Sequence, residues 1–155
     1  MPLTRKGPTQ AVGRLAVAML ILATGCRGGS AKETAALEAR LAEYVQLVQK
    51  MDHHGIAQLY SPYGELQAGP NPVVGPGAIE AFLRGFSDTK VLEYTATADT
   101  TIVHGDRGHQ SGPFHQRVRV PNGQTLDIHG RFQADWERAR DGRWMIRRMG
   151  TVGEQ

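Results

Sequence analysis

The stretch TLDIHGRFQADW (residues 125–136) decides the fold, because apolar and polar residues alternate through most of it. The apolar positions are Leu126, Ile128, Phe132, Ala134 and Trp136. The polar positions between them are Asp127, His129, Arg131, Gln133 and Asp135. A period of two is typical of a strand with one face against a core and the other in solvent. We therefore predict a strand here, with its apolar row turned toward the rest of the domain.

Turn signals on both sides of this strand indicate that it belongs to an antiparallel sheet. Pro121-Asn122-Gly123 precedes it and Asp141-Gly142 follows it. Both are typical of tight turns between antiparallel strands. Gly112-Pro113 indicates a bulge or a sheet edge in the strand before. Further strands are expected over residues 91–103, 109–120 and 143–152, the first of them rich in Thr and Val.

Residues 32–51 show a helical period instead, since apolar side chains recur at steps of three and four. A helix is expected there, and Asp52 is expected to cap the turn that follows it. A short helix over residues 56–60 should end at residues 61–64. A third helix is expected over residues 78–86, and its buried face would hold Ile79, Phe82, Leu83 and Phe86. Helices followed by antiparallel strands predict the α+β class.

The first 25 residues have the pattern of a bacterial export signal. A basic leader precedes LAVAMLILA (residues 15–23), which is too short to span a bilayer but suits a signal peptide. The segment LATGC, ending at Cys26, resembles the lipobox of bacterial lipoproteins. That resemblance implies lipid (palmitate) on Cys26 and a membrane-anchored, exported protein, at the outer membrane facing the periplasm if the source is Gram-negative. Residues 26–31 would be a tether. An ordinary cleaved signal with a chance cysteine is the alternative.

The charge balance argues against nucleic acid as a partner. The leader carries three of the 18 basic residues and none of the 15 acidic ones, so the remaining chain has 15 of each. A nucleic-acid-binding domain would be expected to be basic. Residues 26–106 are net acidic and residues 107–155 net basic, so we expect the two parts to complement each other within one domain. Cys26 is the only cysteine, so no disulfide is expected within the chain.

Four segments resemble the nuclear transport factor 2-like superfamily, especially its SnoaL-like and ketosteroid-isomerase-like members. They are a long helix ending at Asp52, the Gly75-x-x-Ala78-Ile79-x-x-Phe82 segment, the turn at residues 103–106, and the closing residues 136–146. The resemblance implies one domain over residues 32–152, a sheet curved around helices into a cone, and an apolar pocket. The expected pocket walls are Tyr44, Tyr60, Tyr63, Phe82, Tyr94, Phe114, Phe132 and Trp136.

Comparison with ketosteroid isomerases argues against that activity. Their chemistry needs a carboxylate base and an oxyanion hole made of a Tyr and a neutral Asp. By the family's spacing, Tyr44 matches the tyrosine, whereas the base position is Ala68 and the neutral Asp position falls on Ala134 or Phe132. Tyr44 is therefore a core aromatic or a hydrogen-bond donor. Whether the protein is an enzyme stays open.

Three functions remain. The leading one is an envelope lipoprotein that binds a small apolar or amphipathic molecule. The second is a SnoaL-like acid–base enzyme of the isomerase, cyclase or dehydratase type, with Asp99, His115 and His129 as further weak catalytic candidates. The third is a homodimeric interaction module that pairs through the polar face of residues 127–133. No cofactor is expected, and no metal site, because the histidines lack HxH or HxxxH spacing. Neighbouring strands could nevertheless bring His115 and His129 together.

Overall fold

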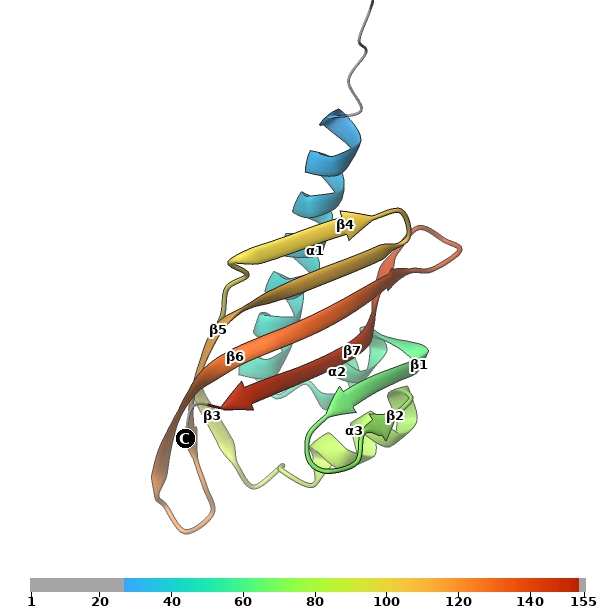
Figure 1. Cartoon of the computed structure of the whole chain (residues 1–155). Helices are drawn as coiled ribbons and strands as arrows, with labels where there is room; N and C mark the ends of the chain where they lie inside the picture. The colour runs from blue at the N-terminus through green and yellow to red at the C-terminus, as the bar shows by residue number, and fades with distance from the viewer. Residues whose placement is uncertain (1–26, 154–155) are drawn as a thin grey trace, which may run out of the picture.

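The computed structural model describes residues 27–153 and has helices packed against one face of a curved sheet (Figure 1). This confirms the α+β class. The three helices are α1 (Arg27–Lys50), α2 (His53–Gln58) and α3 (Pro76–Arg84). The strands are β1 (Tyr60–Gln67), β2 (Val73–Val74), β3 (Lys90–Ala96), β4 (Thr100–His104), β5 (Arg107–Arg119), β6 (Thr125–Arg138) and β7 (Trp144–Gly153).

The decisive stretch forms β6, which lies in the middle of the sheet. The strand order is β2-β1-β7-β6-β5-β3, and β4 also pairs with β5. All pairs are antiparallel except β1 with β7, which is parallel. Helix α1 lies behind the sheet in Figure 1, and α2 and α3 lie at one end of it. The sheet and helices therefore face each other over one concave surface.

The apolar row of β6 faces the helices, as the alternation predicts. Phe132, Ala134 and Trp136 are buried in the main core together with Leu37 and Leu41 of α1. The polar residues between them lie on the opposite, convex face. Burial of this many apolar side chains against the helices is the main stabilising term of such a domain.

The prediction that residues 61–64 are a turn is wrong, because they belong to strand β1. Its pairing with β7 joins segments about 80 residues apart, beginning at Tyr60 and Ile146. The amide of Ile146 also donates to the carbonyl of Leu59, at 2.8 Å. A pairing between segments so far apart produces no periodic pattern in the sequence around residues 61–64, so the strand could not be recognised there. The segment between β1 and α3 contains the short strand β2, which pairs back onto β1.

The single strand expected over residues 91–103 is two strands, β3 and β4, both paired to β5. The change of partner occurs beside Gly112-Pro113. There the amide of Thr97 donates to the Pro113 carbonyl at 3.2 Å, and the amide of Asp99 donates to the Ser111 carbonyl at 3.0 Å. A Cβ at Gly112 would lie 1.9 Å from the Thr97 oxygen, so only glycine fits this crossing.

The helix ends also differ from the expected ones. Helix α1 begins at Arg27, so residues 27–31, which were expected within a tether, have helical backbone. Asp52 caps α2 by accepting a hydrogen bond from the Gly55 amide at 2.8 Å, which confirms its predicted role. Phe86 lies beyond α3 and is 52% exposed, so its predicted burial is wrong. It packs edge-on against Phe82 instead.

The signal peptide and Cys26 lie outside the described residues. No helix within residues 27–153 has the length and apolar character needed to cross a bilayer.

Candidate functional site

A cavity of about 620 Å³ lies between the concave face of the sheet and the helices. Helix α1 contributes Tyr44 and Val48, and α3 contributes Phe82. The sheet contributes mostly apolar side chains. These include Tyr94, Phe114, Val118, Leu126 and Ile128. Leu126 and Ile128 continue the apolar row of β6 beyond the packed core, so the fold leaves a hollow at that end.

Five of the eight predicted wall residues line this cavity: Tyr44, Tyr60, Phe82, Tyr94 and Phe114. Phe132 and Trp136 do not line it, because both are buried in the core beside it. The prediction for Tyr63 is wrong, since this side chain is 85% exposed and lies outside the cavity. Tyr60 and Tyr63 are three residues apart on β1, so the alternation of side chains along a strand turns Tyr60 toward the core and Tyr63 toward solvent.

Three tyrosines gather at the cavity wall. The rings of Tyr44 and Tyr94 meet edge to face, with centroids 6.3 Å apart. Burial raises the pKa of Tyr44 to about 12, although its interaction with the Tyr60 hydroxyl lowers it slightly. Burial also raises the pKa of Tyr60 and of Tyr94 well above the usual value, and the nearby Tyr44 adds to both shifts. All three phenols therefore stay neutral at physiological pH and keep a proton that they can donate in a hydrogen bond.

The Tyr60 hydroxyl is buried and has no partner with good hydrogen-bond geometry among the described residues. The Tyr44 hydroxyl is near enough to raise the pKa of Tyr60 further, but the pair does not meet that geometry. A buried hydroxyl without a partner costs about 1–3 kcal/mol. The tyrosine cluster therefore has spare hydrogen-bonding capacity beside an apolar hollow.

The positions matched to ketosteroid isomerase carry no acid in this cavity. Ala68, at the position of the base, lines it with a methyl group. Ala134 and Phe132 are buried in the core. No Asp or Glu lines the cavity among residues 27–153.

His53 is a titratable lining residue that the sequence reasoning missed. It is the first residue of α2, directly after the capping Asp52. The neighbouring His54 faces away and lies 3.0 Å from the Glu80 carboxylate.

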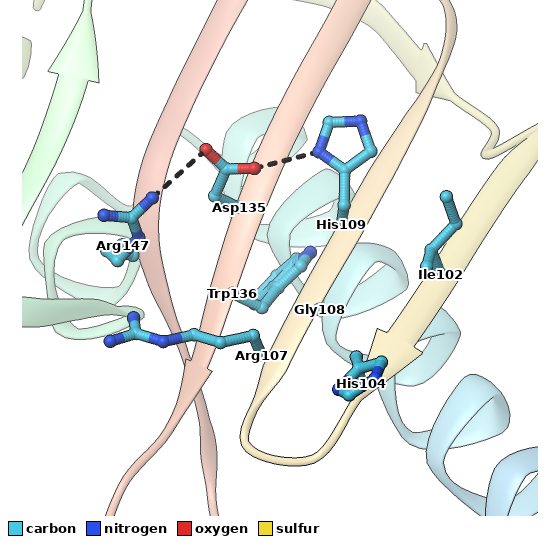
Figure 2. A pocket seen from close by; sticks show the side chains of 8 residues that line it. All are labelled: Ile102, His104, Arg107, Gly108, His109, Asp135, Trp136 and Arg147. Carbon is cyan, nitrogen blue, oxygen red and sulfur yellow. Dashed lines mark hydrogen bonds and ion pairs between the residues drawn. The ribbon is translucent and has the colours of Figure 1, made fainter.

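A second hollow, of about 430 Å³, opens on the convex face at the β4–β5 end (Figure 2). Its polar groups largely satisfy one another. The Asp135 carboxylate lies 2.8 Å from Nδ1 of His109 and 3.7 Å from the Arg147 guanidinium. Because its carboxylate is already paired on both sides and no helix covers it, this hollow is a weaker ligand site than the apolar cavity.

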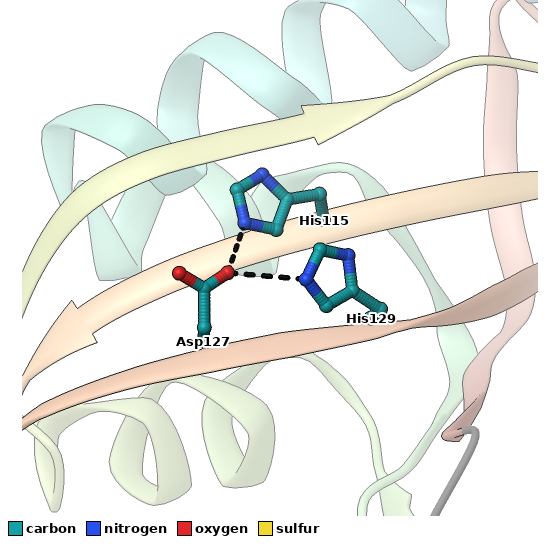
Figure 3. A group of neighbouring side chains, drawn as sticks. All are labelled: His115, Asp127 and His129. Atoms are coloured by element: carbon teal, nitrogen blue, oxygen red, sulfur yellow. Dashed lines mark hydrogen bonds and ion pairs between the residues drawn. The ribbon is translucent and has the colours of Figure 1, made fainter.

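The remaining catalytic candidates, Asp99, His115 and His129, do not line the cavity. Asp99 pairs with Arg131 at 2.7 Å, and this guanidinium lowers the pKa of the Asp99 carboxyl. His115 and His129 are brought together as a cross-strand pair of β5 and β6, as predicted. Their rings stack, and Asp127 lies against both (Figure 3). The hydrogen bond from His115 lowers the pKa of Asp127.

Comparison with known proteins identifies the family. The model of the SnoaL-like domain matches residues 30–150. No curated protein matches the sequence. A ketosteroid isomerase-like protein from Erwinia carotovora atroseptica superposes with a TM-score of 0.73 at 15% identity, over 80% of this chain and 98% of that one.

Two further solved structures share the fold. A variant of a protein of unknown function from Mycobacterium tuberculosis gives a TM-score of 0.75 at 17% identity, over 86% of this chain and 78% of that one. The protein Aln2 from a Streptomyces species gives 0.67 at 18% identity, over 80% of this chain and 92% of that one. At these identities the superpositions support the fold alone. The match of the family model over most of the chain means that this protein belongs to the SnoaL-like domain family.

Proposed function

We propose that the domain binds a small, mainly apolar molecule carrying a hydrogen-bond acceptor, held in the cavity between sheet and helices. The observation that carries this proposal is the combination of an apolar hollow of about 620 Å³ with the hydroxyls of the half-buried Tyr44 and the buried Tyr60 in its wall. The hollow would remove the apolar body of the ligand from water, and a phenol would orient its acceptor.

Size and chemistry both favour this reading. Pockets for small molecules typically measure about 300–1,000 Å³ and have apolar walls with a few polar groups. The walls here are chiefly aliphatic and aromatic, with Gln116, Thr89 and His53 as further polar groups. Phenols that stay neutral donate a hydrogen bond to a carbonyl or ether without the cost of burying a charge.

Binding is favoured over acid–base catalysis because Tyr44 alone of the four catalytic candidates lines the cavity, and its raised pKa keeps the phenol protonated. Asp99, His115 and His129 are on the convex face, and the position of the family's base is Ala68. A general base must come within about 2.6–3.2 Å of the proton that it removes. In the described structure His53 is the lining residue best suited to that role, which keeps a SnoaL-like enzyme as the alternative.

Two ligands of nearly the same shape test the proposal: fluorenone, which carries a ketone, and fluorene, which does not. We expect both to bind to the purified protein in titration calorimetry. Tyr44→Phe should weaken fluorenone binding by about 2–10-fold, the value of one neutral hydrogen bond, and should leave fluorene binding unchanged. Tyr63→Phe is the matched control, because Tyr63 is exposed outside the cavity.

Two results would contradict the proposal. If neither compound bound, the cavity would not be a site for planar apolar molecules of this size. If Tyr63→Phe weakened binding of fluorenone as much as Tyr44→Phe did, the ligand would lie elsewhere.

We also propose that the protein is an exported lipoprotein anchored through Cys26. The support is the signal-peptide pattern and the LATGC segment of the sequence. Multiple acyl chains on one residue hold a protein firmly at a bilayer, since each buried methylene contributes about 0.8 kcal/mol.

Replacing the thiol tests the anchor directly. Cys26→Ser should move the protein from the membrane fraction to the soluble or unprocessed fraction of bacterial cells. Unchanged membrane retention together with normal processing would refute lipidation at this residue.

A further inference from the structure

We propose that His115, Asp127 and His129, on the convex face of the sheet, form a binding site for a divalent transition-metal ion, with zinc as the best match. This site is separate from the ligand cavity, since none of the three lines it. The proposal goes beyond the proposed function and does not depend on it.

The geometry brings three metal-ligating groups together. His115 of β5 and His129 of β6 are directly opposite in the antiparallel register, and their rings stack with centroids 4.4 Å apart and planes 14° from parallel. Nε2 of each ring faces the same carboxylate oxygen, Oδ1 of Asp127, and the distance from His129 is 3.2 Å. Figure 3 shows the carboxylate next to both rings.

These separations suit a tetrahedral ion. One ligand atom from each residue lies within 4.8 Å of the other two. Zinc holds imidazole nitrogens at about 2.0–2.1 Å, so neighbouring ligands of a tetrahedral site are about 3.3 Å apart. Small side-chain rotations would therefore close the site, and the sheet backbone would not need to move. Because each group comes from a strand, the backbone already holds the three in place.

Glu93 supplies a second, independent feature of metal sites. Its Oε1 lies 3.7 Å from Nδ1 of His115, the ring nitrogen that does not face Asp127. Metal-binding histidines usually present their second nitrogen to a carboxylate, which orients the ring and makes the ligating nitrogen more basic. At 3.7 Å this contact is an ion pair and not yet a hydrogen bond; a small rotation of Glu93 would close it and leave Nε2 of His115 available to an ion.

Nearby arginines do not oppose a cation strongly, because each is already paired with a carboxylate. Arg117 lies 3.4 Å from Glu93, and Arg131 lies 2.7 Å from Asp99. Together with Asp127, the carboxylates of Glu93 and Asp99 make three negative charges against the two guanidiniums. Two imidazoles and one carboxylate are ligands that zinc accepts, and three protein ligands leave a coordination position open to water or another molecule.

Spacing along the chain gave no sign of this site, because the histidines lack HxH or HxxxH spacing. The proposed ligands are 14 residues apart at their extremes and meet only through strand pairing. The turn at Asn122-Gly123 and the register of the hairpin create the site.

The test is a metal titration of chelator-treated full-length protein. We expect one equivalent of Zn²⁺ to bind, and Co²⁺ to give the intense visible absorption bands of a four- or five-coordinate ion. Glu93→Gln should weaken Zn²⁺ binding by at least about tenfold. His115→Ala and His129→Ala should weaken it at least as much and abolish the Co²⁺ bands.

His109→Ala is the matched control, because His109 lies on the same strand and face and also touches a carboxylate, Asp135 at 2.8 Å. This variant should bind both ions as the unaltered protein does. The proposal is overturned if the unaltered protein binds no Zn²⁺, if His129→Ala leaves binding unchanged, or if His109→Ala weakens it equally. Circular dichroism of each variant verifies that the sheet is retained.

Discussion

At the scale of single residues, the cavity is defined by tyrosines whose hydroxyls are largely shielded from water. Tyr44 has a pKa raised to about 12 by burial, and Tyr60 and Tyr94 are shifted in the same direction. A raised pKa of an acid means that the folded state keeps its proton more tightly than the unfolded state does. The stabilisation is complete below the unfolded pKa of about 10 and is lost as pH rises through the folded value.

We therefore predict that phenolate absorbance rises in two stages on alkaline titration. Three of the four tyrosines should remain protonated near pH 11 while the protein is folded, whereas all four should ionise together in denaturant. The free energy of unfolding should fall between about pH 10 and pH 12, and less steeply in Tyr44→Phe. Ionisation of all four tyrosines in one step in the folded protein would mean that the cluster is exposed to water.

Some of these residues could be predicted from the sequence and others could not. Asp52 was recognised as a cap because its role depends only on the next three residues. Tyr63 was misplaced because residues 61–64 were expected to be a turn, whereas they lie in strand β1, where side chains three residues apart face opposite sides. His53 was missed because its exposure to the cavity is set by how α2 docks, which no local pattern reports.

At the scale of elements, strands with local signals were predicted and strands with distant partners were not. Strand β6 has an apolar face and a polar face, and tight turns bound the hairpins on both sides of it, so its place followed from its own residues. Strand β1 pairs in parallel with β7, which comes from the other end of the domain. Its partner therefore gave no local signal, and Ser61-Pro62-Tyr63-Gly64 was interpreted as a turn.

Strand β5 shows an intermediate case. Gly112-Pro113 correctly indicated an irregularity in the sheet, but not its nature. The structure explains it as the point where β5 changes partner from β3 to β4. Proline lacks an amide hydrogen, which is tolerated here because the neighbouring strand is interrupted at residues 97–99.

At the scale of the whole molecule, the sheet separates two chemical environments. Its concave face holds the apolar cavity, and its convex face holds the stacked histidines and several ion pairs. Acidic residues of the first half pair with arginines of the second, as the charge distribution predicted: Glu33 with Arg138, Glu65 with Arg148, and Asp99 with Arg131. Exposed pairs of this kind contribute at most about 1 kcal/mol each.

Helix α1 connects the two ends of the molecule. It begins at Arg27, directly after Cys26, and first lines the cavity at Tyr44. At 1.5 Å per residue these points are about 25 Å apart. Under the proposed lipidation, the helix would therefore place the cavity well away from the anchor. Near its N-terminal end, α1 contacts the sheet through a hydrogen bond that Trp144 Nε1 donates to the Glu33 carboxylate, at 3.2 Å.

The most direct measurement of the central claim is a crystal structure of the protein soaked with fluorenone. The account predicts density for the ligand between the sheet and helices, in contact with Phe82 and Ile128, with its ketone oxygen within hydrogen-bonding distance of a hydroxyl of Tyr44 or Tyr60. A structure in which side chains fill that space, or in which fluorenone lies only on the convex face, would contradict it.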